Sequence, residues 1–201
     1  MSAAIQSDIK RVIAYASIGH MNLCVMGLFS FSVISFSGSI ALMIAHGLAS
    51  AGLFFSIGIL YARFHTKNIK YYSGISFIMP IFSFFFFFFI VSNFSLPGTF
   101  SFVGEFLIFS SFFYKYIFFI HSCIIMSILL SSFYSINLFN RLVYTNPVRQ
   151  NMYNASDITI LEFFIFSILF LFIVFLGFFP SMILDYLSND LFFYFESYFV
   201  V

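Results

Sequence analysis

The chain is a succession of long apolar runs separated by short polar interruptions. A bilayer core is about 30 Å thick, so a helix needs roughly 20 apolar residues to cross it. Cutting the chain at its polar interruptions predicts about five crossings, one of them interrupted, and therefore an all-α polytopic membrane protein. The predicted spans are Val12 to Val33, Ser39 to Tyr61, Phe77 to Tyr114, Ile117 to Leu138, and Ile158 to Phe179.

The third run is too long for one straight crossing. At 1.5 Å per residue, a helix from Phe77 to Tyr114 would extend about 57 Å. Its middle contains polar residues followed by Pro97, Gly98 and Thr99. Proline removes a backbone donor and glycine relaxes the dihedral limits, so both favour a break. We predict a single crossing made by a broken helix.

The remaining segments set the predicted organisation. The short uncharged link from Ile34 to Gly38 predicts that the first two spans are antiparallel neighbours. Residues 1–181 are predicted to form the transmembrane domain. Residues 182–201 mix acidic and aromatic side chains, which is typical of a tail lying along the membrane interface.

Composition agrees with this pattern and excludes other classes. Hydrophobic residues make up 62% of the 201 positions and charged residues 7%, whereas about 25% charged is usual in soluble domains. The net charge is +1, and the basic residues form no concentrated patch of the kind that nucleic-acid binding requires. Nucleic acid is therefore excluded as a partner, and membrane lipid is expected.

Basic residues predict the orientation, because loops on the cytoplasmic or matrix side usually carry the excess of Lys and Arg. With one interrupted crossing, only Lys115 falls on the opposite side, which also receives the C-terminus. The basic residues on the positive side are Lys10, Arg11, Arg63, Lys67, Lys70, Arg141 and Arg149.

Three ionisable residues are predicted near the bilayer midplane, where such groups are costly and mark functional sites. Along the helices, His20 lies about 15 Å from Lys10, and His46 about 12 Å from the link. Glu105 lies about 14 Å from the far end of its span. A lone histidine can equally be a neutral packing residue, but a carboxylate beside a broken helix is typical of an ion pathway. Together with Lys10, which lies on the side that carries most of the basic residues, these groups could exchange protons near neutral pH.

Four segments also resemble known proteins. Residues 8–22 (DIKRVIAYASIGHMN), 43–48 (MIAHGL), 63–67 (RFHTK) and 92–106 (SNFSLPGTFSFVGEF) resemble, in this order, the antiporter-like subunits of respiratory complex I. The likeness is best to the subunit 4 family and covers about Gln6 to Asn140. Glu105 stands where subunits 2 and 5, and their relatives in sodium/proton antiporters, usually have lysine.

The resemblance implies roles for individual residues. His20, His46 and Glu105 would belong to a central hydrophilic axis that relays protons, and Lys10 would be the lysine of the family's Asp-Leu-Lys turn. Gly19 replaces a serine often found before the histidine. Pro97 and Gly98 would break the helix that carries the glutamate.

The resemblance also implies partners. The family has about fourteen spans in two inverted repeats, of which this chain matches the C-terminal part. We therefore expect the N-terminal part of subunit 4 as a separate chain, from a divided gene, with subunits 2 and 5 as neighbours. The expected location is the mitochondrial inner membrane, with the basic loops in the matrix.

The expected function is proton translocation as a non-redox subunit of NADH:ubiquinone oxidoreductase. No cofactor or metal is expected in this chain, while NADH, FMN, iron-sulfur clusters and ubiquinone are expected in other subunits. Two alternatives stay open. One is a subunit of a multi-subunit sodium/proton antiporter, and the other is a fragment that supports assembly and no longer conducts.

Overall fold

The computed structural model describes residues 6–72, 74–115, 118–144 and 156–187, which are almost entirely helical. A further helical turn covers residues 181–187. The main helices are α2 (Ile9–Leu28), α3 (Val33–Phe64), α5 (Pro80–Asn93), α6 (Phe100–Lys115), α7 (Phe118–Val143) and α8 (Ile160–Phe178), and the short elements are η1 (Ile69–Tyr71) and α4 (Ile75–Ile78).

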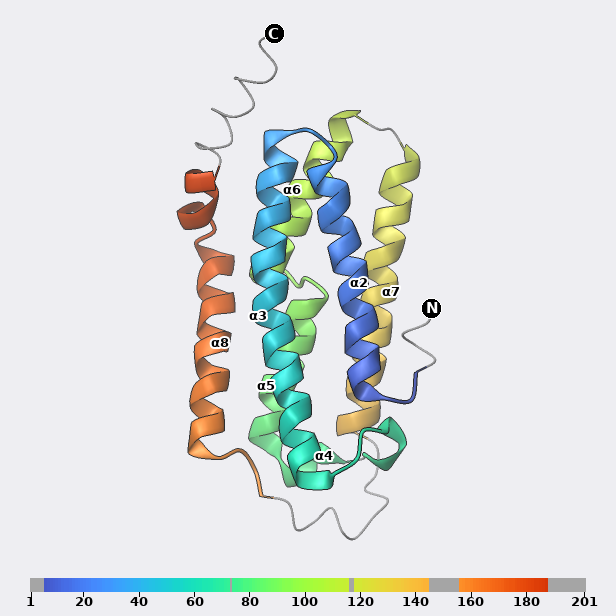
Figure 1. Cartoon of the computed structure of the whole chain (residues 1–201), viewed down its shortest axis with the longest axis vertical. Coiled ribbons are helices and arrows are strands. Elements are labelled where there is room, and N and C mark those ends of the chain that lie inside the picture. The colour runs from blue at the N-terminus through green and yellow to red at the C-terminus, as the bar shows by residue number, and fades with distance from the viewer. Residues whose placement is uncertain (1–5, 73, 116–117, 145–155, 188–201) are drawn as a thin grey trace.

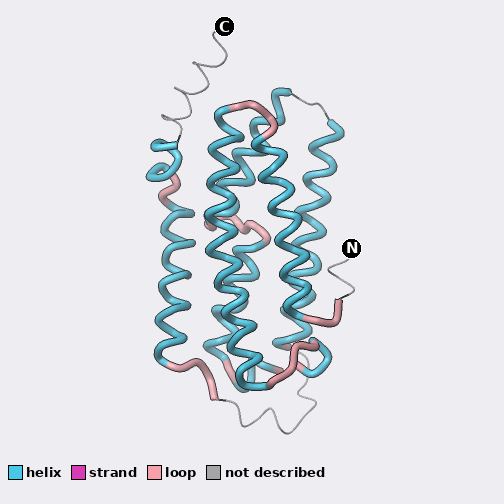
Figure 2. Tube along the Cα trace, in the orientation of Figure 1, coloured by secondary structure: helices cyan, strands magenta, loops and turns pink. Residues whose placement is uncertain are grey.

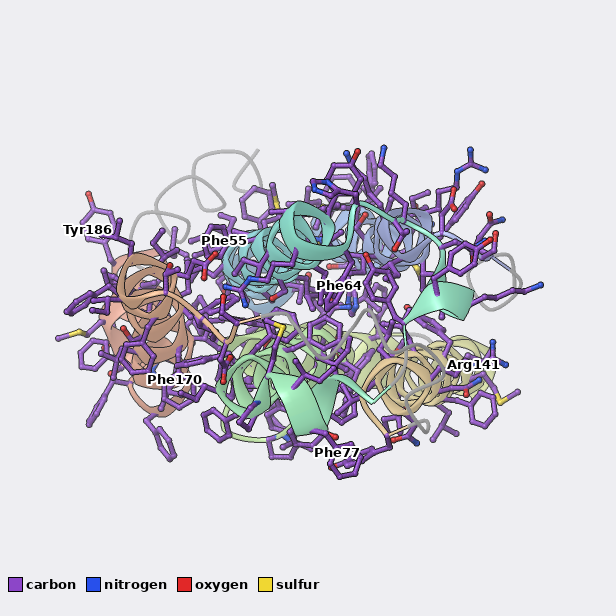
Figure 3. The ribbon with its side chains drawn as sticks, turned by 90° about the horizontal axis from the view of Figure 1, so that it is seen from below. Phe55, Phe64, Phe77, Arg141, Phe170 and Tyr186 are labelled. Carbon is purple, nitrogen blue, oxygen red and sulfur yellow. The ribbon has the colours of Figure 1, made fainter. Side chains whose placement is uncertain are left out.

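The long helices run roughly parallel to one axis and form two layers (Figures 1 and 2). Seen along that axis, α2 and α3 form one layer and α5, α6 and α7 the other, with α8 at one edge (Figure 3). Helix α3 packs against α2, α5, α6 and α8. It is therefore the central helix of the bundle.

The connection between the first two helices lies earlier than the sequence predicted. Helix α2 ends at Leu28 and α3 begins at Val33, so the predicted link at Ile34 to Gly38 was wrong. Ser32 caps α3, because its side chain accepts a hydrogen bond from the Ser35 backbone N–H. The prediction missed this because hydropathy counting ignores capping. The two helices are nonetheless antiparallel neighbours, as predicted.

The broken third helix is confirmed. Helices α5 and α6 are stacked end to end around residues 94–99, so the broken segment passes through the bundle once (Figure 1). At the break, Ser95 has a φ of 61° and Gly98 a φ of 97°, both left-handed. Ser101 in the first turn of α6 donates to the Ser92 carbonyl of α5 at 2.5 Å. This bond satisfies a carbonyl that the interrupted helix leaves without its regular partner.

Two described helices, Val33–Phe64 and Ile160–Phe178, are long and apolar enough to cross a bilayer by length and composition. Helices α5 and α6 are shorter apolar helices. The core of the lower half in Figure 1 is aromatic, with Phe82, Phe85 and Phe89 of α5 packed against Phe166 of α8. The apolar runs therefore supply both the interior and a large exposed apolar surface.

Charge is segregated along the bundle. Apart from Lys115, the described basic residues lie in the first turn of α2, the last turns of α3 and α7, and the connection that contains η1. These segments meet at the lower end in Figure 1, which we call the basic end. Lys115 ends α6 at the opposite end, and Arg149 lies outside the described residues. Residues 188–201, most of the predicted interfacial tail, also lie outside them, so that assignment stays a prediction. The basic end contains Lys10, Arg11, Arg63, Lys67, Lys70 and Arg141.

Two glycines allow α3 and α6 to approach closely. A Cβ atom added at Gly104 would lie 2.7 Å from the Leu42 backbone nitrogen, and one at Gly38 would lie 2.8 Å from the Leu107 Cβ. Neither position has room for a side chain. This contact places Glu105, the next residue, at the interface with α3.

Gly104→Ala is expected to destabilise the bundle by about 1–3 kcal/mol, because the new methyl group meets backbone that has to move. The measurement is the thermal inactivation midpoint of the assembled membrane complex. Gly47→Ala on α3 is the matched control, since a Cβ there meets nothing within 4 Å. An equal effect of the two substitutions would contradict the close approach.

Helix α8 is attached to the basic end by a polar cluster. Arg63 Nη2 lies 2.8 Å from Glu162 Oε2, and the same guanidinium donates to the Ser156 carbonyl. Glu162 also completes a capping box with Thr159 at the start of α8. Asp157 accepts from the backbone N–H groups at the start of α5. The segment before α8 is thus bound to both α3 and α5.

Arg63→Ala is expected to cost about 1–3 kcal/mol, because it leaves partly buried acceptors without their charged donor. The same thermal inactivation assay measures it. Arg11→Ala is the control, because the Arg11–Asp8 pair is exposed at 69% and 36% and such pairs contribute about 0–1 kcal/mol. If Arg11→Ala were as damaging as Arg63→Ala, the attachment of α8 would not depend on this cluster.

Candidate functional site

A buried polar cluster lies where α2, α3 and α6 meet. His20 Nδ1 lies 3.2 Å from Glu105 Oε1, and the two residues are 7% and 5% exposed. The His46 ring stacks on the His20 ring with centroids 5.3 Å apart and planes 30° apart. The fold therefore brings together the three residues that the sequence placed at one depth.

The local sequence explains this arrangement. The tight turn after Leu28 makes α2 and α3 antiparallel neighbours, so a histidine on each can meet across the interface. His46 follows Leu42 by four residues, which places both on the same face of α3. Gly104 packs against Leu42, and Glu105 follows it directly. The small residue thus positions the carboxylate beside the histidines.

The contact between His20 and Glu105 can hold a proton in two ways. A neutral imidazole protonated at Nδ1 donates a hydrogen bond to the carboxylate, and a protonated imidazole forms an ion pair with it. Two stacked imidazoles repel when both are charged, so one added proton is shared more easily than two. The cluster can therefore accept a proton, hold it and release it.

The other predicted residues lie outside this cluster. Lys10 is exposed at the start of α2, ten residues from His20, or about 15 Å along the helix. Pro97 and Gly98 are exposed in the break and provide its backbone geometry rather than a titratable group. The structure thus places the predicted site residues in three separate places, which are the buried cluster, the helix break and the basic end.

The cluster opens onto a cavity of about 90 Å³, which we call the inner cavity. His20 Nε2 is buried and has no hydrogen-bond partner among the described residues. A volume of this size accommodates roughly three waters, and the polar residues that line it favour their binding. The residues around the inner cavity include Tyr15, Ala16, His20, Glu105, Ser131 and Tyr134.

Sequence reasoning missed the contribution of α7 to this site. Ser131 and Tyr134 are three residues apart, so they lie on one face of the helix, and both line the inner cavity. The sequence signal for this face was their spacing of three residues on α7, which carries several other serines as well. Among the described residues, no group of three or more His, Cys, Asp or Glu could hold a metal ion.

Sequence comparisons identify relatives of the chain. Residues 1–131 match the family described as NADH:quinone oxidoreductase/Mrp antiporter, TM. Over 180 residues the chain is 42% identical to NADH-ubiquinone oxidoreductase chain 4 of Triticum aestivum, covering 90% of this chain and 36% of the wheat protein. It is 35% identical over 187 residues to NADH-quinone oxidoreductase subunit M of Rhodobacter capsulatus, covering 91% and 36%.

Solved structures share the fold. A chain of respiratory complex I from Thermus thermophilus matches with a TM-score of 0.85 and 26% identity, covering 94% of this chain and 40% of that chain. A chain of the Mrp complex from Dietzia sp. DQ12-45-1b has a TM-score of 0.81 at 14% identity, covering 92% and 42%. This second likeness shows the fold alone.

The predicted resemblance to subunit 4 is confirmed. The chain spans a little over a third of the length of the chain 4 and subunit M relatives named above. Over 94% of its length the chain shares the fold of the matched complex I chain. The chain belongs to the NADH:quinone oxidoreductase/Mrp antiporter transmembrane family.

Proposed function

We propose that this chain is part of the proton-translocating subunit 4 of NADH:ubiquinone oxidoreductase. The observation that carries the proposal is the buried contact between His20 and Glu105, 3.2 Å long, beside a broken helix. Identity of about 40% to chain 4 proteins supports the assignment of the complex. The subunit acts without a redox cofactor of its own, and NADH, FMN, iron-sulfur clusters and ubiquinone belong to other subunits.

The proposed arrangement in the membrane has five crossings, made by α2, α3, the α5–α6 pair, α7 and α8. Their alternating direction and the charge segregation support this count. The basic end faces the matrix of the mitochondrial inner membrane, because basic loops favour that side. Residues 1–181 form the transmembrane domain and residues 182–201 the interfacial tail.

The proposed mechanism is proton transfer through the buried cluster. Glu105 and His20 exchange a proton across their contact, and His46 continues the axis on α3. Water in the inner cavity, which His20 and Glu105 both line, connects this contact to the next group. The break at Pro97 and Gly98 lets α6 shift against α5 during turnover. Lys10 supplies positive charge at the basic end.

The proposed partners are the N-terminal part of subunit 4 and the neighbouring subunits 2 and 5. Purification through a tag on this chain tests both the complex and the partners. We expect NADH:quinone reductase activity to copurify, and mass spectrometry to find the N-terminal part of subunit 4 together with subunits 2 and 5. Copurification of antiporter subunits without NADH oxidation would contradict the proposal.

The sodium/proton antiporter alternative predicts a cation requirement. In sealed vesicles that contain the complex, NADH oxidation should build a pH gradient at the same rate in sodium-free potassium medium as in sodium medium. The assay is the quenching of a pH-sensitive dye. A gradient that forms only with sodium would favour the antiporter alternative.

A further inference from the structure

Helix α8 contacts the chain on both sides of the break between α5 and α6. Its start lies at the basic end, and its C-terminal end lies at the height of the break (Figure 1). The helix packs against α3, α5 and α6. Because α8 carries no group of the buried cluster, these contacts need another explanation.

The first half of α8 is joined to α5. Phe166 of α8 stacks on Phe85 with ring centroids 5.3 Å apart. Just before the helix, the Asp157 carboxylate accepts hydrogen bonds from the backbone N–H groups of Ile81 and Phe82, at 3.1 and 3.3 Å. These bonds satisfy donors that the start of α5 leaves without partners in its own helix. The start of α5 and the first half of α8 are therefore fixed to each other.

The last turn of α8 is in backbone contact with the break itself. A Cβ atom added at Gly177 would overlap the Gly98 carbonyl oxygen. It would also lie 2.9 Å from the Gly98 carbonyl carbon and 3.0 Å from the Thr99 carbonyl carbon. All three atoms belong to the backbone, and the φ of 97° at Gly98 is one that other residues rarely adopt. Neither side of this contact can yield by changing a side-chain rotamer.

The same turn of α8 also reaches the start of α6. Leu176 packs against a buried cluster made of Phe100, the first residue of α6, and two alanines of α3. Phe100 precedes Glu105 by five residues, or about 7.5 Å along the helix. Because packed interiors transmit displacements, a shift of the first turn of α6 also shifts the carboxylate.

We infer that α8 bridges the break and sets the position of Glu105, with Gly177 and Leu176 as positioning residues. The inference rests on the proposed function only in naming proton pumping as what that position affects. Glu105 Oε1 lies 3.2 Å from His20 Nδ1, and proton transfer needs a separation of about 2.6–3.2 Å or one bridging water. A displacement of about 1 Å is therefore enough to slow the transfer strongly.

The number of protons pumped per NADH oxidised, measured in sealed vesicles below the inactivation temperature, tests this inference. Gly177→Ala pushes the break away from α8. We expect it to lower the pumping ratio at least about threefold and to shift the pH at which pumping is half-maximal. Gly58→Ala on α3 adds the same methyl group where a Cβ meets nothing within 4 Å, so it should change neither. A Gly177→Ala complex that is less heat-stable but keeps the ratio and the pH profile would overturn the inference.

A second variant perturbs the same contact in the opposite sense. Leu176→Ala removes packing beside Phe100 and adds no bulk at the break, so it remains measurable where Gly177→Ala does not assemble. We expect its pumping ratio to fall at least about twofold. Leu171→Ala, on the exposed side of the same helix at 62%, is the matched control. Equal ratios for these two leucine variants would contradict the positioning role.

Glu105→Gln in the same assay separates this inference from the proposed function. If Glu105→Gln loses pumping while Gly177→Ala and Leu176→Ala keep it, the proposed function stands and α8 does not position the carboxylate. If Glu105→Gln pumps normally, the proposed function fails. The contact between α8 and the break is then still tested by the thermal inactivation temperature, which Gly177→Ala should lower and Gly58→Ala should not.

Discussion

A complex carrying Glu105→Gln is expected to lose at least about tenfold in proton pumping per NADH oxidised. Gln keeps the size of the side chain and its hydrogen-bonding reach, but it cannot take up or release a proton. Positioned acid–base groups typically contribute about 10²- to 10⁴-fold to a proton-transfer step. The measurement is the ratio of the initial pH-gradient rate to the NADH oxidation rate in sealed vesicles.

Two further variants make this result specific. Glu105→Asp keeps the carboxylate but retracts it from His20, so we expect it to preserve part of the pumping. Asp185→Asn removes an acidic group from the turn after α8 and should leave pumping unchanged. Normal pumping by Glu105→Gln in an assembled complex would instead support the non-conducting structural fragment.

Much of the fold follows from local properties that the sequence displays. The break between α5 and α6 could be predicted because Pro97 and Gly98 act on the backbone where they stand. The depth of Glu105 could be predicted because its distance from a helix end is a count of residues. The start of α3 was misplaced because Ser32 ends the turn through a cap, and a cap leaves no mark in hydropathy.

The candidate site was predictable only in part. Counting residues along the helices predicted a similar depth for His20, His46 and Glu105, but it could not predict that they are within contact distance of each other. That contact depends on Gly104 allowing α6 to approach α3, a property of two surfaces rather than of one segment. Tyr134 was missed for the same reason, since its position beside the inner cavity depends on how α7 lies relative to α2 and α6.

The second large effect is expected at His20, the partner of the buried carboxylate. His20→Leu removes the imidazole that lies 3.2 Å from Glu105. Glu105, which is only 5% exposed, then has no imidazole beside its carboxylate. Leaving a buried polar group without its partner typically costs about 1–3 kcal/mol, and more where that group is charged. We therefore expect both a loss of pumping and a marked fall in the thermal inactivation temperature of the complex.

The double variant His20→Leu/Glu105→Gln separates the two effects. It removes the carboxylate that the single variant leaves unpartnered, so stability should recover most of the loss while pumping stays absent. Contacting residues characteristically show such non-additivity, whereas independent sites add. If the two substitutions lowered stability additively, His20 would be a packing residue of α2, and the proton shared between His20 and Glu105 would have no energetic basis.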